Sequence, residues 1–476
     1  DSLKNVVLYD LTVFIDKKYI RILTDLGLNV YLFSDLVRSN EKTMKDDSLS
    51  QFRIQKPDDI LTICYTSGTT SVPKGAMLTQ KSFYAVGMAI DDLGYKLDEG
   101  EVVISYLPLA HSFERFVSLN AFIRRARIAF MSGIDIKKTL IQNLKDFKPT
   151  ILFTVPKILI NVHRKLKEEI NKLPFWKKYL IETALQNKKW NYKKYFSIKH
   201  RLYDSLFFSK FNNVFGVRLK IIFVGSAPLP KEIAEEIQLF VSIPIVEGYG
   251  LTETCGVSQA SYYIDRSNSS LGSCIRCDYL KLVDVNEMNY HSKDEKSSPK
   301  GEICYKGPSI FTGYFRNERG TKEVIDSNGW FHTGDIGMID VETGGLVLID
   351  RLKEIFKLSQ GEYISPSKLE SEYLKSKYIN QICILGDSLE SSIVAIIVIN
   401  KDVLLRRMKE VGLRKEEEDE SFQEEALLKK ENFLFLNEEI KKSLLKIADE
   451  ERFNFLEIPS KFIFTMKLFV VVVMGQ

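Results

Sequence analysis

Hydrophobic runs bounded by turn residues alternate with helix-like stretches through most of the chain, and this alternation constrains the fold more than any other feature. Three of the runs are Ile60–Tyr65, Ile151–Val155 and Lys220–Val224. Short apolar runs are typical of buried strands, and strands that alternate with helical segments favour a sheet covered by helices. The sequence therefore predicts an α/β protein.

A change in composition near Asp350–Glu354 predicts the division into domains. A turn-rich β region ends there, and a smaller Lys/Glu-rich α+β region follows. Because 476 residues suffice for two or three domains, we expect a hinge between a large lobe of α/β subdomains (1–349) and a small mobile α+β domain (350–476). The chain begins without methionine and ends in a Val-rich tail. We therefore expect the large domain to be incomplete at its start and the small domain to be incomplete at its end.

The composition excludes several classes of protein. Hydrophobic residues make up 45% and charged residues 27% of the chain, which excludes wholesale disorder, a collagen-like repeat and a disulfide-stapled miniprotein. The longest apolar run, Leu468–Met474, is far shorter than a membrane span, and no signal peptide is seen at the start. The six cysteines are sparse, which favours a reducing compartment. Cys274 and Cys277 lack the second pair or nearby histidines that a zinc site needs.

A polar, glycine-containing loop, Thr66–Gly75, directly follows the first of the predicted strands. Glycine lets backbone N–H groups approach an oxyanion, hydroxyls donate hydrogen bonds, and lysine supplies charge. The loop is not a Walker A sequence, because Pro73 precedes Lys74 and a glycine follows it. We interpret it as a phosphate-binding loop of another class rather than a flexible turn, and Thr79 is a candidate cap for a helix over Gln80–Asp91.

A second glycine-rich element, Gly248–Thr254, could be mistaken for a dinucleotide fingerprint. Its sixth position is Glu253 rather than glycine, so the Rossmann pattern fails. Tyr249 between two glycines offers a flat face for a base, while the hydroxyl and carboxylate that follow can hold Mg²⁺ near phosphates. A nucleotide site and a plain turn both fit this element taken alone.

Two short acidic turns complete the set of candidate nucleotide contacts. Asp335 follows the aromatic run Trp330–His332, and Asp350 with Arg351 opens the predicted hinge. A short carboxylate in a tight turn is suited to accept hydrogen bonds from ribose hydroxyls. Each would more often be a turn aspartate or a surface pair if it stood alone, so their value lies in their order and co-occurrence.

Five segments, taken in order, resemble the adenylate-forming, AMP-binding enzyme superfamily. They are Tyr65–Gly75, Gly225–Leu229, Gly248–Thr254, Trp330–Asp335 and Asp350–Ile364. Within this superfamily the chain resembles the eukaryotic long-chain fatty acyl-CoA synthetases, and the segments that carry this likeness are Tyr106–Arg115, Gly313–Phe315 and Phe356–Ile364. The likeness extends from about Pro57 to Ile393.

The resemblance implies roles for individual residues at the phosphate end of the site. The ATP phosphates would be held by the glycine-containing loop, through Thr66, Ser67, Gly68, Thr69, Thr70 and Lys74. Mg²⁺ would be coordinated with the help of Thr66 and Glu253. These assignments agree with the chemistry of hydroxyl, ammonium and carboxylate groups around a triphosphate.

The resemblance also implies roles around the nucleoside, the acyl chain and CoA. The nucleoside would be lined by Gly225, Ser226, Ala227, Pro228, Gly248, Gly250 and Thr252. Tyr249 would stack on adenine, and Asp335 with Arg351 would hold the ribose. His111 would lie beside the acyl channel, and Gly361 near the thiol of CoA once the small domain has rotated; Lys357 is a further candidate cofactor-binding residue.

The resemblance implies ATP-dependent activation of a long-chain fatty acid to an acyl-adenylate, followed by thioester formation with CoA. Catalysis then rests on positioning and charge neutralisation, and no covalent enzyme nucleophile is needed. The implied partners are the fatty acid, ATP, Mg²⁺ and CoA, with no nucleic acid. The implied location is the cytoplasm, with peripheral association to the endoplasmic reticulum or another intracellular membrane.

One departure from the family pattern keeps alternatives open. The family has a C-terminal lysine that contacts the substrate carboxylate and the α-phosphate; here Glu457–Phe464 lies in the right neighbourhood, but the expected pattern does not follow and Lys467 comes too early. A shorter-chain or aryl acid:CoA ligase therefore remains an alternative, as does a catalytically impaired fragment that binds ATP and an acyl chain.

Basic residues concentrate in one stretch of a nearly neutral chain. The 67 Lys and Arg against 63 Asp and Glu give a net charge of +4, which does not indicate a nucleic-acid partner. Asn161–Lys220 holds fifteen basic against four acidic residues, a local excess of eleven, together with several aromatic residues. Such a stretch could lie against anionic lipid, attract the phosphates of CoA, or be an ordinary lysine-rich helical surface.

Overall fold

The computed structural model of the chain describes residues 4–8, 17–40, 55–66, 73–91, 94, 96–132, 136–212, 214–261, 270–293, 298–412 and 430–466. The chain folds into two compact units, Asp1–Lys56 and Pro57–Gln476. The predicted division near Asp350 falls inside the second unit and stays a prediction.

The first unit contains a parallel pair of strands. Strand β1 (Asn5–Leu8) pairs with β2 (Asn29–Leu32), and the side-chain amide of Asn29 donates to the Asn5 carbonyl oxygen at 2.9 Å. Helix α1 (Lys17–Asp25) lies between the strands in the chain, and α2 (Phe33–Asn40) follows them. The connection contains a helix, as is usual between parallel strands.

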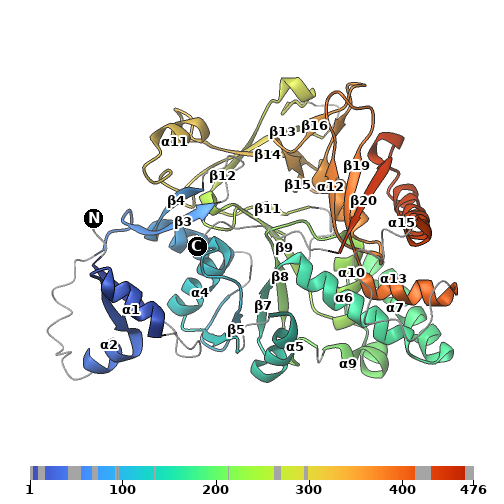
Figure 1. Cartoon of the computed structure of the whole chain (residues 1–476), viewed down its shortest axis with the longest axis horizontal. Coiled ribbons are helices and arrows are strands. Elements are labelled where there is room, and N and C mark those ends of the chain that lie inside the picture. The colour runs from blue at the N-terminus through green and yellow to red at the C-terminus, as the bar shows by residue number, and fades with distance from the viewer. Residues whose placement is uncertain are drawn as a thin grey trace. The chain divides into compact units, whose positions relative to one another are not determined.

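A five-stranded sheet forms the centre of the second unit (Figure 1). Its three parallel strands are β7 (Ile151–Thr154), β8 (Ile221–Val224) and β9 (Ile245–Tyr249), and β10 (Gln259–Ala260) and β11 (Ser273–Cys274) extend it antiparallel. Every residue of β7 and β8 is buried. Alternating side chains therefore enter two cores, with Phe153 and Phe223 in one and Leu152 and Ile222 in the other.

The helices that cover this sheet include the basic stretch noted in the sequence. Their bounds are α5 (Ile136–Phe147), α6 (Pro156–Asn171), α7 (Phe175–Tyr195), α8 (Arg201–Tyr203), the π-helix η2 (Asp204–Phe208), α9 (Ser209–Asn212) and α10 (Lys231–Val241). Helix α10 packs against α6 and α7. In the described ranges, no helix has both the length and the apolar composition of a membrane span.

The predicted strand after Pro57 is present but less buried than predicted. Strand β3 (Ile60–Thr66) pairs with β4 (Lys74–Thr79) in a two-stranded antiparallel ladder. Of its side chains only Cys64 is buried, while Ile60 is 49% and Tyr65 60% exposed. The prediction of a buried strand was wrong, because among the β3 side chains only Cys64 belongs to an apolar core.

The predicted helix after this ladder is confirmed together with its cap. Helix α3 (Gln80–Asp91) begins where the sequence placed it, and the Thr79 hydroxyl accepts a hydrogen bond from Ser82 N at 3.1 Å. Beyond it lie β5 (Val102–Ser105), α4 (Ser112–Ile123) and β6 (Arg127–Phe130). Strands β5 and β6 pair parallel.

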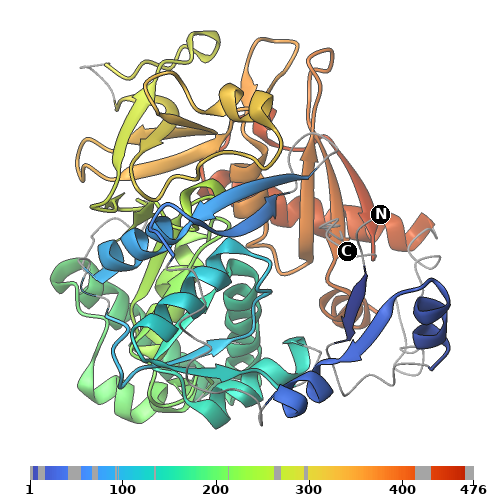
Figure 2. The same cartoon turned by 90° about the vertical axis from the view of Figure 1, so that its left-hand side faces the viewer.

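An antiparallel sheet of four strands follows (Figure 2). Its strands, in order, are β12 (Tyr279–Val283), β13 (Lys300–Lys306), β14 (Phe331–Ile339) and β15 (Leu346–Arg351). The short helices nearby are η3 (Thr252–Thr254), η4 (Asn286–Met288) and α11 (Glu318–Val324). The segment before α11 reaches the β3–β4 ladder, because Phe315 N donates to Gly75 O at 2.7 Å.

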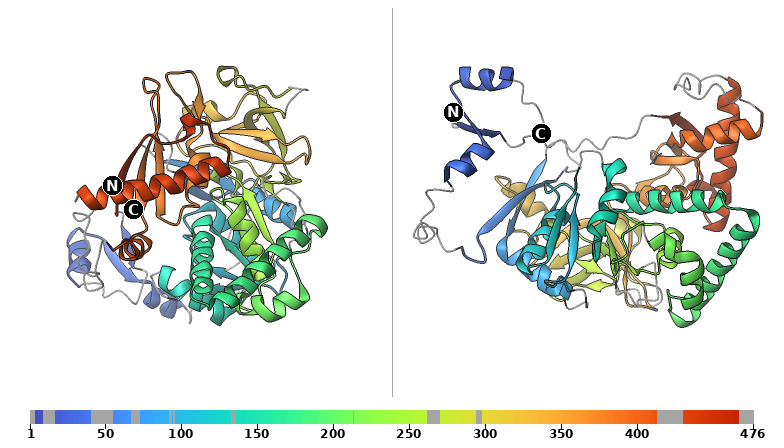
Figure 3. Two further views of the ribbon diagram at one scale, coloured as in Figure 1. Left: turned by 90° about the vertical axis from the view of Figure 1, so that its right-hand side faces the viewer. Right: turned by 90° about the horizontal axis from the view of Figure 1, so that it is seen from below.

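The residues after Asp350 form the two-stranded β16–β17 hairpin and a separate three-stranded sheet, together with helices. The strands are β16 (Phe356–Lys357), β17 (Tyr363–Ile364), β18 (Ile379–Leu385), β19 (Val394–Ile399) and β20 (Lys461–Thr465); the helices are α12 (Pro366–Tyr373), α13 (Lys401–Glu410), α15 (Lys430–Glu450) and η6 (Phe455–Glu457). Helix α15 lies against β18, β19 and β20 through a shared apolar core (Figure 3, left). Asp350 fastens the start of α12, since its Oδ2 accepts from Ser365 Oγ at 2.6 Å and from Ser367 N at 3.0 Å.

Candidate active site

A cleft opens at the carboxyl ends of β8 and β9, where their loops meet the start of α4. It encloses about 890 Å³, including its open mouth. In α/β sheets the carboxyl ends of parallel strands are where ligands bind. Seven of the predicted site residues line this cleft: His111, Gly225, Ser226, Gly248, Gly250, Thr252 and Arg351.

The opposite end of the cleft is apolar and shares a wall with a second, smaller cavity. Both cavities are lined by Ile90, Phe116, Phe153 and Phe223. The second one extends past Gly87, Leu97, Asn120 and Ile151 to an ion pair between Arg124 and Asp91. The site therefore has a polar mouth and an aromatic, apolar interior.

The loop after β8 brings two of its four predicted residues to the cleft. Gly225 is buried and lines it, and a Cβ at this position would lie 3.4 Å from Gly248 O. Ser226 also lines it and has a φ of +74°, a left-handed conformation that costs energy for a residue other than glycine. Ala227 and Pro228 are exposed and are not among the lining residues.

Gly250 is needed because two backbone segments approach each other closely at the cleft. A Cβ on Gly250 would lie 2.5 Å from Gly256 O and 2.6 Å from the Cα of Val257. Backbone atoms cannot turn away as a side chain can. The glycine therefore allows the chain after β9 to fold back against itself and form the cleft wall.

Replacing Gly250 by alanine should destabilise the fold by about 2 kcal/mol or more, because the added methyl group overlaps backbone atoms. Urea denaturation of the variant measures the change in free energy of unfolding. Gly100→Ala is a matched control, since a Cβ there meets nothing within 4 Å, and it should leave stability within about 0.5 kcal/mol. Equal stabilities for both variants would contradict the close approach.

Tyr249, Asp335 and Arg351 meet from three strands of two sheets. The Tyr249 hydroxyl donates to Asp335 Oδ2 at 2.5 Å, and Arg351 Nε lies 3.7 Å from Asp335 Oδ1. The Tyr249 ring is buried and tilted against Tyr305, with ring centres 6.4 Å apart, and Tyr249 is not among the cleft-lining residues. The structure thus links Tyr249 to the predicted ribose-binding carboxylate, and stacking on adenine stays a prediction.

Burial makes the Asp335 carboxyl harder to ionise. Asp335 is only 4% exposed, and this burial raises its pKa to about 6, while the Tyr249 hydroxyl and Arg351 act in the opposite direction. Burial also raises the pKa of Tyr249 well above its ordinary value, with the Asp335 charge adding to the effect. At neutral pH the pair is a carboxylate that accepts from a phenol.

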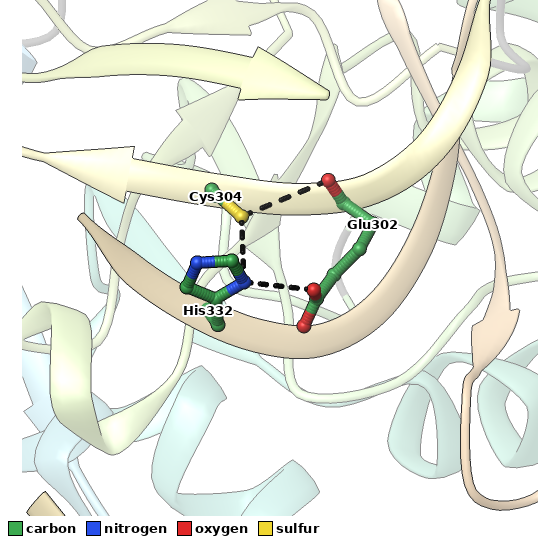
Figure 4. A group of neighbouring side chains, drawn as sticks. All are labelled: Glu302, Cys304 and His332. Carbon is green, nitrogen blue, oxygen red and sulfur yellow. Dashed lines mark hydrogen bonds and ion pairs between the residues drawn. The ribbon is translucent and has the colours of Figure 1, made fainter. Parts of the chain in front are cut away.

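Three side chains support the strand that carries Asp335 (Figure 4). Glu302 Oε1 accepts from Gly334 N at 3.0 Å, and Glu302 Oε2 lies 2.8 Å from His332 Nδ1. Cys304 Sγ lies 3.4 Å from the same histidine nitrogen. Sequence reasoning did not identify Glu302; the available signal was a carboxylate between Gly301 and Ile303, which are both buried in strand β13.

Two groups of described side chains have donor atoms close enough to hold a metal ion: Glu302, Cys304 and His332, and Glu232, Glu372 and Glu451. In the first group both carboxylate oxygens are engaged, and burial raises the pKa of Cys304 to about 12, which favours the thiol over a ligating thiolate. In the second group Lys375 Nζ lies within 2.6 Å of all three carboxylates and balances them. We interpret both groups as structural.

Lys74 and Glu253 are linked through Tyr314, which sequence reasoning did not single out as a site residue. The Tyr314 hydroxyl donates to Glu253 Oε1 at 2.7 Å, and Lys74 Nζ lies 5.2 Å from the centre of the Tyr314 ring. Thr66 Oγ1 donates to Lys74 O at 3.4 Å across the β3–β4 ladder. The predicted phosphate-binding residues Ser67, Gly68, Thr69 and Thr70 lie outside the described residues.

Of the remaining predicted residues that the structure describes, His111 lines the cleft, whereas Lys357 and Gly361 do not. His111 precedes α4 in extended conformation and lines the cleft with an exposed side chain. Lys357 and Gly361 belong to the β16–β17 hairpin, where Lys357 Nζ lies 5.3 Å from the centre of the Tyr363 ring, and neither residue lines the cleft. Lys467 lies outside the described residues.

Comparison with known proteins identifies the class of protein. Residues 19–315 match the family described as "AMP-binding enzyme". Because this match covers more than half of the chain, the chain belongs to the AMP-binding enzyme family.

Its relatives by sequence are fatty acyl-CoA synthetases by name. Fatty acyl-CoA synthetase B of Dictyostelium discoideum is 36% identical over 403 residues, which are 83% of this chain and 57% of that protein. Long chain acyl-CoA synthetase 6, peroxisomal, of Arabidopsis thaliana is 40% identical over 382 residues, 79% of this chain and 52% of that protein. The chain thus spans about half the length of these relatives.

Solved structures support the fold. The adenylation and carrier didomain of a carboxylic acid reductase from Segniliparus rugosus, in complex with AMP, matches with a TM-score of 0.74 at 23% identity, covering 98% of this chain and 58% of that one. ATP-bound MatB from Rhodopseudomonas palustris matches with a TM-score of 0.63 at 20% identity, covering 98% and 76%. The predicted α/β fold is therefore confirmed.

Proposed function

We propose that the protein activates a long-chain fatty acid with ATP to an acyl-adenylate and then transfers the acyl group to CoA. The observation that carries this proposal is the two-ended cleft, which has a glycine-rich polar mouth and an aromatic interior, with a second cavity behind the wall that includes Phe153 and Phe223. A site for a nucleotide alone would need no apolar extension. A site for a fatty acid alone would need no glycine-lined mouth.

The polar mouth supports the proposed nucleotide position. Gly225, Gly248 and Gly250 line it with little more than backbone, which permits a flat base to approach closely. Arg351 lines the cleft and lies 3.7 Å from Asp335, whose carboxylate accepts from the Tyr249 hydroxyl, and this grouping supports a ribose-binding role for Asp335 and Arg351. We assign Asp335 as the acceptor and Arg351 as a donor.

The phosphate end is assigned to Lys74, Thr66 and Glu253. Hydroxyl and carboxylate oxygens are the ligands that Mg²⁺ prefers, so Thr66 and Glu253 fit this ion, with Tyr314 fixing the orientation of the carboxylate. Mg²⁺, when bound there, would neutralise charge on the phosphates. The positive charge of the Lys74 ammonium would stabilise negative charge on the α-phosphate as pyrophosphate leaves.

In the proposed reaction the protein positions the fatty acid, ATP and CoA, and no covalent bond to the protein is formed. The fatty acid carboxylate attacks the α-phosphorus of ATP, the bond to the β-phosphate oxygen breaks, and pyrophosphate departs. The CoA thiolate then attacks the acyl carbon and displaces AMP. The cleft supports this sequence because one end can hold the apolar tail while the other presents its carboxylate to the nucleotide.

Pyrophosphate release with ATP and a series of acids tests the proposal. We expect palmitate to be used at least ten times more efficiently than octanoate, in kcat/KM, because each buried methylene adds apolar burial. Phe153→Ala removes part of the wall that the two cavities share and should shift this preference between palmitate and octanoate. Phe130→Ala is the control, because Phe130 is exposed and lines neither cavity.

The other outcomes decide between the alternatives. Faster release with benzoate than with any fatty acid would replace the proposal by an aryl acid:CoA ligase. A maximum at octanoate would indicate a shorter-chain ligase. Binding of ATP by calorimetry without release of pyrophosphate for any acid would identify an impaired fragment.

We further propose a cytoplasmic location with peripheral contact to the endoplasmic reticulum or another intracellular membrane. The exposed aromatic and lysine residues of α7 support this contact. No nucleic-acid partner is proposed, because the net charge is only +4.

A further inference from the structure

Helix α7 has two faces that are both apolar, although only one of them packs on the protein. Its buried residues are Ile181, Ala184, Leu185 and Lys188, at the spacing of one helical face. The opposite stripe carries large side chains that stay exposed: Phe175 (84%), Trp176 (59%), Tyr179 (61%), Leu180 (43%) and Trp190 (56%). We call these five residues the α7 outer face.

The buried face of α7 is held by hydrogen bonds and an ion pair to residues of η2 and α10 and to Ser242. The Lys188 ammonium is fully buried and donates to Asp204 Oδ1 at 2.6 Å, to Leu239 O at 2.5 Å and to Ser242 Oγ at 2.8 Å. Lys189 Nζ lies 2.9 Å from Glu236 Oε1. Because these bonds fix the rotation of the helix, the α7 outer face points away from the core as a stable surface.

The position of α7 within its unit leaves this face accessible. The helix lies at the periphery of the second unit (Figure 3, right). The adjoining segment adds two exposed leucines, Leu202 (58%) and Leu206 (62%), and is joined to α7 by the bond from Asn187 Nδ2 to Tyr203 OH at 2.9 Å. Large aromatic and aliphatic side chains that are exposed together on one helix face and on the segment bonded to it indicate an interaction site.

Lysines lie at both ends of the α7 outer face. Lys177 Nζ lies 5.2 Å from the centre of the Trp176 ring, and Lys194 Nζ lies 4.8 Å from that of Trp190. Lys178 has an ion pair of 3.8 Å with Glu182, the single acidic residue of the helix. The exposed lysines therefore give the face a positive charge that an anionic surface would complement.

We propose that the α7 outer face binds the surface of an anionic lipid bilayer, with the helix axis in the plane of the interface. Indole and phenol rings favour the boundary between headgroups and acyl chains, and lysine side chains reach from there to the lipid phosphates. A helix of 21 residues presents about 30 Å of such surface. This docking surface lies outside the cleft; it rests on the peripheral membrane contact proposed above and names the residues and the lipid charge that would make that contact.

Vesicle sedimentation with two matched pairs of variants tests the proposal. The intact chain should bind vesicles of phosphatidylcholine with phosphatidylserine at least ten times more strongly than phosphatidylcholine alone, and 0.5 M salt should weaken this binding. Lys193→Gln with Lys194→Gln should weaken it about 10- to 30-fold. Lys441→Gln with Lys442→Gln, two consecutive exposed lysines on α15, should not.

Tryptophan fluorescence locates the contact, because the chain has three tryptophans and two of them, Trp176 and Trp190, lie on the α7 outer face. Anionic vesicles should shift the emission to shorter wavelength. Trp176→Phe with Trp190→Phe leaves Trp330 alone, so vesicle binding should persist without the shift. Trp176→Ser with Trp190→Ser should lose binding at least tenfold.

A control and two contrary outcomes complete the test. Tyr84→Ser with Tyr279→Ser removes two aromatic residues that are 59% and 72% exposed elsewhere, and should not affect vesicle binding. Equal binding to both vesicle types, no binding to either, or binding unchanged in the serine variant would overturn the proposal. A concentration-dependent dimer abolished by the same variant would assign the face to a second copy of the chain instead.

The test does not depend on the proposed reaction. Vesicle binding is measured without ATP, and pyrophosphate release is measured with octanoate, which needs no membrane. The serine variant should keep the rate of the intact chain in that assay. Loss of vesicle binding by the serine variant with an unchanged rate would therefore support the docking surface. Absence of pyrophosphate release in the intact chain would contradict the proposed reaction and would leave the docking surface untouched.

Discussion

Replacing Lys74 by alanine is expected to lower the rate of pyrophosphate release about 100- to 1,000-fold while the fold stays intact. The proposed role of Lys74 is to stabilise charge that develops as pyrophosphate leaves, and removing one such group from a preorganised site typically has an effect of this size. The side chain contributes little to folding, because its Nζ lies over the Tyr314 ring at 5.2 Å from the ring centre, a weak contact. Stopped-flow or coupled-enzyme measurement of pyrophosphate gives the rate.

A nearby lysine provides the control for this variant. Lys81 lies on α3, pairs with Asp58 at 3.5 Å and is about half exposed, so Lys81→Ala should keep the rate within a factor of two. Urea denaturation should place both variants within about 1 kcal/mol of the parent. An unchanged rate for Lys74→Ala would remove Lys74 from the phosphate site, and a rate that fell only in step with stability would make its role structural.

Replacing Asp335 by asparagine is expected to have opposite effects on nucleotide binding and on stability. The carboxylate is the proposed acceptor for two ribose hydroxyls, and hydrogen bonds to a charged group are worth about 1.5–3 kcal/mol each. Affinity for ATP should therefore fall about 10- to 100-fold. Isothermal titration calorimetry measures this loss directly and does not require turnover.

The stability of the same variant should rise at neutral pH. The Asp335 pKa is about 6 in the folded protein against an ordinary value of 3.8. A carboxyl that binds its proton more tightly when folded costs stability above pH 6, and this cost disappears below pH 3.8. Two pKa units correspond to about 3 kcal/mol. Asparagine cannot ionise, so Asp335→Asn should gain up to about that amount at pH 7 and nothing near pH 3.8.

Urea denaturation of the parent and the variant between pH 4 and pH 8 tests the linkage. The difference in free energy of unfolding should grow as pH rises through about 6 and then level off. Asp340→Asn, just beyond the end of β14 and outside the cleft, should show no such growth. A difference that is constant with pH would mean that burial does not control this carboxyl, and unchanged ATP affinity would remove it from the ribose site.

The local features of the fold could be predicted because short stretches of chain encode them. The helix over Gln80–Asp91 begins at a side-chain cap three residues from its bonded amide, and the strands at Ile151 and Ile221 are buried at every position. The exception is β3, where an apolar run forms a half-exposed strand. Burial depends on what lies on the other side of a strand, and no local pattern records it.

The sequence was enough to predict which segments form the candidate site, but it did not predict which side chains in that site contact each other. Gly225, Gly248 and Gly250 line the cleft, and each belongs to a segment that the sequence analysis singled out. Glu302 and Tyr314 were missed as site residues because their partners are distant in sequence. Glu302 bonds a backbone amide 32 residues away, and Tyr314 bonds Glu253 across 61 residues.

The sequence by itself determined the order of strands, glycine loops and helices, and with it the family and the chemistry of the groups available. The tertiary structure decided which of these groups meet. Tyr249 and Asp335 are 86 residues apart and share one hydrogen bond. It also decided which face of α7 is buried, since Lys188 on that face bonds Asp204 and Leu239 O, which are 16 and 51 residues away in the chain. Local patterns act over a few residues, whereas burial, pairing and pKa depend on neighbours that only folding supplies.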